Sequence, residues 1–322
     1  MNKKLIAIAI ATAMTAPVAM ADVKVSGRVG GHLTVYSHDN AANDWTGFSD
    51  AGQTRLQFDA TAGDAFARIA LDERLGRDNA TATSYKRTKR DNYIGYNFGN
   101  MSAAFGRMAG VAKNIEKDPY IATFLQSRGT IAEPLAGGAQ YGSSSFIDHV
   151  ITFKMKAGAA NVAIQYDVGD QSAGSPNEGH TGIAVTGKGG PVDYFFAYNN
   201  GTASGQSGST PNNDESNMKL GASMKFGKVK ATLVYQSADN NGAGQSAITV
   251  RGNFGLGDGL SMNGAVGLRS GDTAADDATW LRVAVMKKLN ANASAYAGYT
   301  STTYDAAGND NNTLGGGMIV KF

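Results

Sequence analysis

Alternation of apolar and polar residues is the feature that most constrains the fold of this chain. In the segment 22–37, odd positions carry apolar residues such as Val23 and Leu33, and even positions carry polar residues such as Arg28 and Thr34. Because successive side chains of a β-strand point to opposite faces, this segment is predicted to be a two-faced strand. The pattern recurs to the last residue without a helical section. It therefore predicts either a soluble sandwich or a closed membrane barrel.

The segment 1–21 has the features of an export signal that is not part of the fold. It begins with the basic residues Lys3 and Lys4, continues with an apolar stretch, and ends in a small-x-small cleavage site at Ala21. We predict that this signal peptide is cleaved and that the mature protein leaves the cytoplasm. One domain is then predicted over 22–322.

Composition excludes several classes of protein. The chain has no cysteine, which rules out a lipidated cysteine, disulfides, thiol catalysis and thiolate metal sites. It has 29 Lys and Arg against 27 Asp and Glu, and two of the lysines lie in the predicted signal peptide, so the mature chain is neutral. A neutral chain argues against a nucleic-acid partner. No later apolar run reaches about 18 residues, so no membrane helix is predicted.

The mature chain divides into sixteen strand-like segments, with ends uncertain by a few residues. They are 22–37, 51–61, 64–75, 85–98, 101–108, 146–156, 159–169, 179–188, 191–200, 215–226, 228–238, 245–255, 259–270, 277–288, 291–304 and 312–322.

Connections between these segments alternate between short turns and long polar loops. Short ones include 61–64, 98–100 and 189–191, and long ones include 201–214 and 305–311. This alternation places the tight turns at one end of an up-and-down sheet and the loops at the other. Transmembrane barrels have this arrangement, with an even number of strands, short periplasmic turns and longer outer loops.

Aromatic residues mark the tight-turn end. Phe98, Phe226 and Phe254 each precede a turn glycine, and the chain ends in Phe322. Aromatic residues favour strands in general, but rings at one common depth are typical of the interfacial girdle of a membrane barrel. Closure of the sheet also removes its edges, and about sixteen strands leave a water-filled channel. The sequence therefore favours a closed antiparallel transmembrane β-barrel.

Five short motifs extend this prediction to a family. They are Gly27-Arg28-Val29, Thr54-Arg-Leu-Gln-Phe58, Arg90-Asp-Asn-Tyr-Ile-Gly95, Phe105-Gly-Arg107 and the terminal Gly317-Met-Ile-Val-Lys-Phe322. In this order and spacing, the mature sequence resembles Gram-negative general diffusion porins. The resemblance implies a homotrimer of sixteen-stranded barrels in the outer membrane. It also implies that the closing strand, through Met318, Val320 and Phe322, is read by the barrel-assembly machinery.

The resemblance further implies that the third outer loop folds into the lumen. The connection 109–145 spans 37 residues, far more than the other loops, and loops of this length are usually functional or disordered. It contains Phe124, Leu125 and Leu135, which need burial. We therefore expect this loop to fold inward.

In such porins, a basic wall faces an acidic loop across the narrowest part of the channel. By matching motif, the basic wall here comprises Arg28, Arg55 and Arg90, with Arg68 as a neighbour. Opposed charges produce a transverse field, and a Debye length of about 8 Å limits its reach to a narrow neck. These arginines are also compatible with ordinary solvated positions on the inner wall.

The acidic side of the neck is expected on the long loop, which offers Glu116, Asp118 and Glu133. One departure from the family concerns the next strand. Enterobacterial relatives carry a further wall arginine there, whereas 146–149 in this chain reads Phe-Ile-Asp-His. We therefore predict no strong anion selectivity.

Signals for catalysis or metal binding are weak. The four histidines have no metal-ligand spacing, and Asp148-His149 lacks the strand-turn-helix elbow of a serine hydrolase. The glycine-rich segment 255–259 runs into a strand and is predicted to be a tight turn. The loops 272–277 and 305–312 either bind divalent cations at the lipopolysaccharide surface or are simply solvated. No catalytic residue, metal or cofactor is predicted.

These features predict an outer-membrane porin for passive diffusion of small hydrophilic solutes and ions. Its expected partners are outer-membrane lipid and lipopolysaccharide, the barrel-assembly machinery, its own trimer mates and its solutes. Three alternatives remain open. A substrate-specific channel needs a line of aromatic residues along the lumen, and a barrel hydrolase needs a Ser-His pair on the outer wall. A structural or adhesive barrel would have a plugged lumen.

Overall fold

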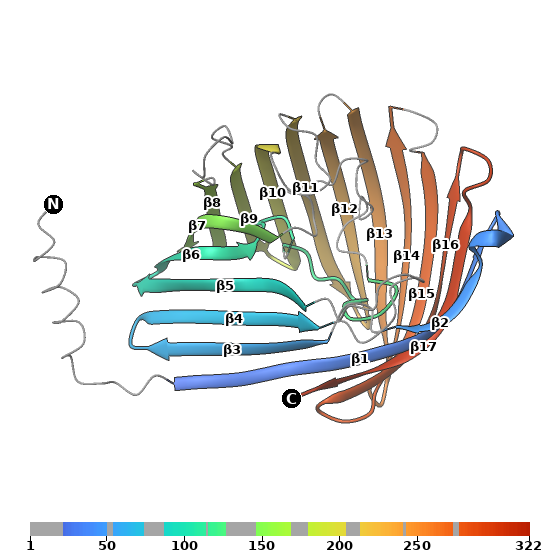
Figure 1. The fold of residues 1–322 in the computed structure, drawn as a ribbon, viewed down its shortest axis with the longest axis horizontal. Coiled ribbons are helices and arrows are strands. Elements are labelled where there is room, and N and C mark those ends of the chain that lie inside the picture. The colour runs from blue at the N-terminus through green and yellow to red at the C-terminus, as the bar shows by residue number, and fades with distance from the viewer. Residues whose placement is uncertain are drawn as a thin grey trace, which may run out of the picture.

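The alternating segments of the sequence form neighbouring strands of one antiparallel sheet (Figure 1). A computed structural model describes residues 22–49, 54–73, 87–113, 115–126, 146–168, 180–203, 213–240, 243–272 and 277–322. No helix within these ranges is long and apolar enough to cross a membrane. The predicted signal peptide lies outside them and stays a prediction.

The first half of the described chain contains nine strands and a short 3-10 helix, η1. They are β1 (Asp22–His38), η1 (Ala41–Asn43), β2 (Trp45–Ser49), β3 (Arg55–Ala62), β4 (Ala65–Glu73), β5 (Arg87–Phe98), β6 (Met101–Ala109), β7 (Phe146–Ala157), β8 (Ala160–Asp167) and β9 (His180–Gly189). The second half contributes β10 (Val192–Ala203), β11 (Asn213–Phe226), β12 (Val229–Asn240), β13 (Ala243–Gly257), β14 (Leu260–Gly271), β15 (Ala278–Lys288), β16 (Ala293–Tyr304) and β17 (Asn311–Lys321).

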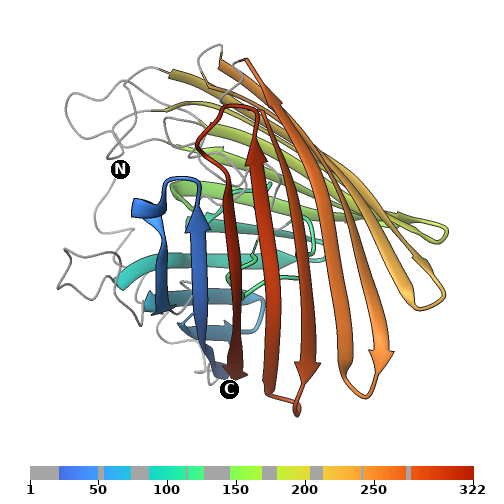
Figure 2. The same cartoon turned by 90° about the vertical axis from the view of Figure 1, so that its right-hand side faces the viewer.

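The sheet closes on itself through β1. One edge of β1 pairs with β17, and the other pairs with β2 and β3 (Figure 2). Because β2 pairs with one half of β1 and β3 with the other half, β2 and β3 together act as a single strand of the barrel. The prediction of a closed antiparallel barrel of about sixteen strands is confirmed. The separate strand β2 was not predicted, since the sequence indicated one strand over 51–61.

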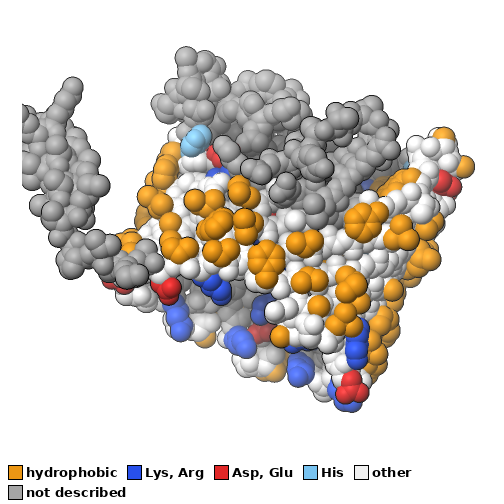
Figure 3. Space-filling view, turned by 60° about the horizontal axis from the view of Figure 1, so that its bottom comes forward, with side chains coloured by type: hydrophobic (Ala, Val, Ile, Leu, Met, Phe, Trp, Pro, Cys, Tyr) orange, Lys and Arg blue, Asp and Glu red, His pale blue; other side chains and the backbone are white. Residues whose placement is uncertain are grey.

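The two faces of the barrel wall are inverted relative to a soluble protein. Large apolar side chains lie on the outside, where Val23 and Leu33 are each 56% exposed. The inner face carries polar side chains such as His32, Thr34 and Gln236, which are 4%, 1% and 0% exposed. Figure 3 shows apolar side chains spread over the outer surface. An apolar outside and a polar inside suit a wall between lipid and water.

The tight turns lie at one end, as predicted. Gly99 and Gly227 adopt positive φ angles of 66° and 58° in two of these turns, a backbone conformation that favours glycine. The preceding residues Phe98 and Phe226 are exposed on the outer face. Phe322 is 61% exposed, and so it also points outward at the same end. These positions fit an aromatic girdle at the membrane interface.

The C-terminal residue seals the barrel against β1. The backbone N–H of Gly27 donates to the Phe322 carbonyl at 2.9 Å, and the Phe322 N–H donates to the Gly27 carbonyl at 3.1 Å. A Cβ atom at Gly27 would lie 2.6 Å from the Arg55 carbonyl oxygen and would collide with the Phe322 ring. Glycine is therefore required at this position for the closing strand to dock.

The described part of the connection between β6 and β7 lies inside the barrel (Figure 1). Of the residues of this connection, the structure describes 110–113 and 115–126. Tyr120 and Leu125 pack against Ala265 on β14 and Ala284 on β15. The start of the connection, from Val111 to Ile115, packs instead against β8, β9 and β10. The described part of the connection therefore lies against the inner wall, first on the middle strands and then on the C-terminal strands. Residues 127–145 are outside the described residues, so the in-folding of the whole third loop stays a prediction.

Candidate functional site

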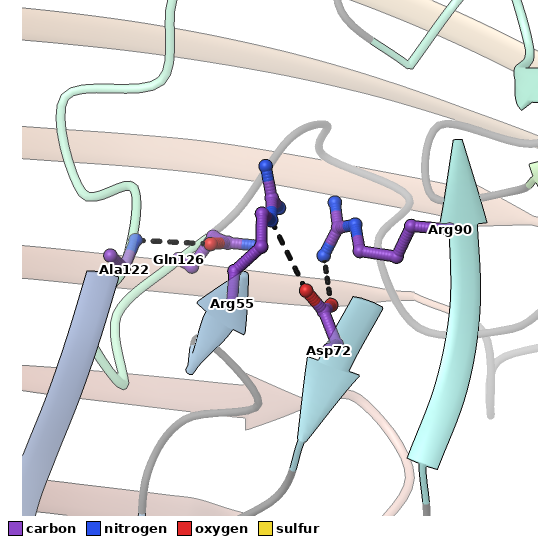
Figure 4. Close-up of polar contacts among 5 residues, drawn as sticks. All are labelled: Arg55, Asp72, Arg90, Ala122 and Gln126. Carbon is purple, nitrogen blue, oxygen red and sulfur yellow. Dashed lines mark hydrogen bonds and ion pairs between the residues drawn. The ribbon is translucent and has the colours of Figure 1, made fainter. Parts of the chain in front are cut away.

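Two of the predicted basic residues converge on one carboxylate of the inner wall. Arg55 on β3 donates from Nε to Asp72 on β4 at 3.1 Å, and Arg90 on β5 pairs with the other oxygen of Asp72 (Figure 4). The three side chains are between 8% and 19% exposed. We call Arg55, Asp72 and Arg90 the strand cluster. Two guanidinium groups and one carboxylate leave it with one net positive charge.

A β-bulge brings Arg90 into this cluster. Ile69 pairs with Asn92, whereas Leu71 pairs with Lys89, so β5 carries one residue more than β4 at this point. A bulge changes the direction of the side chains beyond it. In a regular strand, residues three positions apart point to opposite faces. Because of the bulge, Arg90 and Tyr93 instead both face the interior of the barrel.

Further cations surround the ring of Phe146, the first residue of β7. The Arg90 guanidinium lies 4.6 Å from the ring centroid, Lys113 Nζ lies 3.5 Å from it, and the Arg107 guanidinium lies 5.8 Å from it. Arg107 also donates to Asp148 at 2.5 Å. Cations over an aromatic face are stabilised by its quadrupole. The segment that lacks a wall arginine therefore receives cations from β5, β6 and the long connection.

The other two predicted wall residues occupy different places. Arg28 on β1 lies opposite Arg55 in the β1–β3 register, and is thus one strand away from the strand cluster. Arg68 donates to Asp59 at 2.6 Å instead. It lies four residues from Asp72 along β4, about 13 Å nearer the tight-turn end at 3.3 Å per residue. The structure brings Arg55 and Arg90 together, places Arg28 beside them, and leaves Arg68 apart.

Glu116 of the long connection reaches the wall opposite the strand cluster. Its Oε1 lies 3.5 Å from Lys219 Nζ on β11, and its Oε2 lies 3.3 Å from Arg251 Nη1 on β13. The three side chains are at most 4% exposed. We call Glu116, Lys219 and Arg251 the loop anchor. The sequence analysis did not select Lys219 and Arg251, although both lie on the polar face of alternating segments.

The residues after Glu116 fold into a compact turn. Asp118 is 8% exposed, and one of its carboxylate oxygens accepts from the Tyr120 N–H at 2.9 Å. Burial raises the pKa of Tyr120 to about 12, and the Tyr120 hydroxyl donates to the Arg282 carbonyl at 3.4 Å. The third predicted acid, Glu133, lies outside the described residues. Asp118 therefore has a role in shaping the loop.

Leu125 fits over a glycine of the barrel wall. A Cβ atom at Gly298 would collide with Leu125 and would lie 2.7 Å from the Val283 carbonyl oxygen. Phe124 lies beside it, with its ring centroid 5.6 Å from that of His32 and 6.1 Å from that of Tyr296. This packing fixes the loop against β16 and the adjoining strands.

Two lumenal cavities lie on either side of the long connection. One of 730 Å³ lies toward the tight turns and is lined by Asn97, Asn100 and Lys156 together with Val111 of the connection. The other, of 570 Å³, lies toward the long loops and is lined by wall residues and by Gln126 of the connection. The described connection therefore separates an inner from an outer vestibule.

Within the described ranges, no group of three or more His, Cys, Asp or Glu side chains is arranged to hold a metal ion. Asp148 pairs with Arg107, and His149 adopts a positive φ of 55° next to the register shift between β6 and β7. This geometry accounts for both residues as parts of the wall.

A family profile described as Gram-negative porin matches residues 7–307. The chain belongs to the Gram-negative porin family. With its closed barrel, this porin is a diffusion channel, and its family and fold point to the outer membrane. A search of curated protein sequences finds no match.

Solved porin structures share the fold at low sequence identity. An anion-selective porin from Comamonas acidovorans superposes with a TM-score of 0.77 at 16% identity, covering 94% of this chain and 100% of that one. OmpF of Salmonella typhi in complex with daunomycin gives 0.70 at 14% identity, covering 93% and 97%. The trimer form of OmpT, an outer membrane protein of Vibrio cholerae, gives 0.68 at 17% identity, covering 94% and 99%.

Proposed function

We propose that this porin passes small hydrophilic solutes and ions passively, without catalysis, through a neck lined by the strand cluster. The observation that carries this proposal is a polar lumen crossed by residues 115–126, with one cavity on each side of them. Diffusion through such a lumen needs only an aqueous path and a narrow charged section. Arg28 extends the basic wall of this neck, and Arg68 lies nearer the tight-turn end of the barrel.

The neck has a mild preference for anions in this proposal. Arginine stays charged at any physiological pH, and the strand cluster keeps one net positive charge after Asp72 is counted. Glu116 is occupied by Lys219 and Arg251 and is shielded from solutes. The described loop acids therefore contribute little opposing field. One structural neighbour is named as an anion-selective porin, which agrees with this preference.

The protein is also proposed to assemble as a homotrimer, with each barrel providing one channel. Met318, Val320 and Phe322 at the end of β17 are 50%, 45% and 61% exposed on the outer face. They are therefore accessible to an assembly partner before membrane insertion. Export by the signal peptide over 1–21, and contact of the outer loops with lipopolysaccharide and divalent cations, belong to the same proposal.

Planar-bilayer recording tests the channel proposal. The purified porin should give large ohmic conductance steps, in groups of three if the trimer forms. Absence of conductance would refute the channel, and saturable block by one sugar or phosphate would favour a substrate-specific channel.

A salt gradient tests the residues of the neck. Replacing Arg55 and Arg90 together with serine should move the reversal potential toward cation preference. Arg269→Ser is the matched control, because Arg269 lines the outer vestibule, away from the strand cluster, and its charge should affect the neck less. An unchanged reversal potential in the double variant would remove both residues from the neck.

A further inference from the structure

The tight-turn mouth of the barrel is rich in inward lysines. Eight lysines lie within four residues of a tight turn or of either terminus of the segment 22–322. Each lies on the inward face of its strand, the face that also carries the buried polar side chains. They are Lys24, Lys154, Lys156, Lys188, Lys225, Lys230, Lys288 and Lys321. Figure 3 shows Lys and Arg side chains gathered along the lower margin of the molecule. Seven strands supply these lysines, so the charge surrounds the mouth.

Few carboxylates balance this charge in the part of the chain that the structure describes. The inward acids near the same turns are Asp22, Asp59 and Asp193, and Asp64 and Asp258 lie in the turns themselves. Asp59 is already bonded to Arg68 at 2.6 Å. Asp193 lies 3.4 Å from Lys188 and 3.7 Å from Lys230, so it serves two cations. The mouth therefore keeps a positive excess.

The arrangement of the lysines carries a cost in stability. Lys225 on β11 lies directly opposite Lys230 on β12 in the register. Like charges directly opposite one another destabilise a strand pair. Asp193, which lies 3.7 Å from Lys230, offsets only part of this repulsion. The lysines are therefore more readily explained by a role in the water-filled mouth than by stabilisation of the wall.

Two of the lysines line a concave space. Lys154 and Lys156 line the 730 Å³ inner cavity together with the amide side chains of Asn97, Asn161 and Gln165. Ammonium and amide groups are hydrogen-bond donors to phosphate and carboxylate oxygens. The Asn97 and Gln165 amides already donate within the protein and Asp91 lines the same cavity, so an anion that enters it meets chiefly the two lysines.

At the opposite mouth, the part that the structure describes is rich in acids. Its described acids include Asp39, Asp239, Asp272, Asp277, Asp305 and Asp310. Several cap the outer loops, such as Asp272, which accepts from the Gly244 N–H at 2.6 Å, and Asp310, which accepts from the Tyr304 N–H at 2.8 Å. Among the described residues, fixed charge is thus mainly positive at one mouth and mainly negative at the other.

We propose that the lysine-lined mouth is a collecting vestibule for small multivalent anions, such as phosphates, entering from the tight-turn, periplasmic side. The inference rests on the proposed diffusion channel. A mouth lined by charge of one sign raises the local concentration of counter-ions by a factor of 10 or more. Because the described residues of the other mouth are mainly acidic, this enrichment is expected on one side, and the channel should respond asymmetrically to anions.

Inorganic tripolyphosphate, added to one side of oriented channels in a bilayer, tests the vestibule. The chain has no cysteine, so Asn309→Cys in an outer loop can report orientation through an impermeant thiol label. In about 0.1 M salt, tripolyphosphate should reduce conductance at an about tenfold lower concentration from the tight-turn side. In about 1 M salt, where the Debye length is about 3 Å, this sidedness should disappear.

Substitution of the lysines provides a second test of the vestibule. Replacing Lys154, Lys156, Lys225 and Lys230 with glutamine should abolish the sidedness while conductance remains. Lys287→Gln is the matched control, because Lys287 lies at the same mouth but on the outward face, with its Nζ donating to the Asp258 carbonyl at 2.6 Å. It should leave the sidedness unchanged.

The outcomes separate the two proposals. A protein that gives no conductance refutes the channel itself. A conducting wild-type channel that tripolyphosphate blocks equally from both sides overturns the vestibule and leaves the channel intact. Sidedness that survives the fourfold substitution, or that persists in about 1 M salt, also overturns it. The salt experiment needs only the wild-type protein, so the test stands even if the fourfold variant fails to fold.

Discussion

The strand cluster and the loop anchor have the same charge composition but occupy opposite walls of the barrel. Each joins two cations to one carboxylate. The strand cluster is built from three adjacent strands and keeps up to 19% exposure at Arg55. The loop anchor joins a loop acid to two strands, and Lys219 is 0% exposed.

Burial decides what each arrangement does. Charges taken out of water need their partners, because an uncompensated buried charge costs several kcal/mol. Charges that water still reaches are screened and depend less on their partners. In the proposed channel, the same composition would therefore hold the loop on one wall and set the field of the neck on the other.

The largest effect is expected from breaking the loop anchor. Glu116→Gln leaves Lys219 and Arg251 buried without their carboxylate, which should cost about 3–5 kcal/mol of unfolding free energy. Equilibrium unfolding in detergent measures this loss, and bilayer recordings should show current fluctuations from a loosened loop. Adding Lys219→Met should recover part of the loss by removing one uncompensated charge. A variant within about 1 kcal/mol of the wild type would contradict the anchor.

The second effect concerns the fit of the loop on the wall. Gly298→Ala should displace Leu125 and cost about 1–3 kcal/mol, because the new methyl group collides with both Leu125 and the Val283 carbonyl. Gly264→Ala is the control, since no atom lies within 4 Å of a Cβ at that strand position. Equal unfolding free energies for the two variants would show that the contact is unimportant.

The third effect is expected from removing the carboxylate of the strand cluster. Asp72→Asn leaves two guanidinium groups side by side, of which Arg55 keeps 19% exposure, so it should cost about 1–2 kcal/mol, less than Glu116→Gln. The neck gains positive charge, and the reversal potential in a salt gradient should move toward anion preference. A reversal potential equal to that of the wild type would place Asp72 outside the conducting path.

The smallest effect is expected at Tyr120. Tyr120→Phe removes one hydrogen bond to the Arg282 carbonyl and should cost about 0.5–1.5 kcal/mol. Because burial raises the pKa of Tyr120 from 10.0 to about 12, its contribution is complete below pH 10 and is lost as the pH rises through 12. Unfolding measured at pH 9 and pH 12 should therefore show a smaller pH-dependent loss in the variant. Identical pH dependence would contradict this assignment.

Much of the fold could be predicted because side chains alternate between the two faces of a strand every second residue, a pattern visible within a short segment. The alternation in 22–37 gave both the strand β1 and its outward face, and the ends of most other strands agree within two or three residues. The short strand β2 (Trp45–Ser49) was not predicted. Residues 45–49 form too short a segment for alternation to be recognised.

The basic side of the neck could be predicted only in part. Arg55 and Arg90 were selected by motif, and the structure joins both to Asp72. Alternation alone could not place Arg90 and Tyr93 on one face, because the bulge in β5 interrupts the period. Whether the selected residues form the neck stays a prediction.

The sequence by itself determined the strands, the turns and the face that each strand turns to lipid, because these depend on neighbours one or two residues away. Only the tertiary structure decided which charges meet. Glu116 finds Arg251 at a separation of 135 positions, and this contact exists because closing the barrel brings the long connection against the opposite wall. Charge pairing across a lumen depends on that closure, which no local pattern encodes.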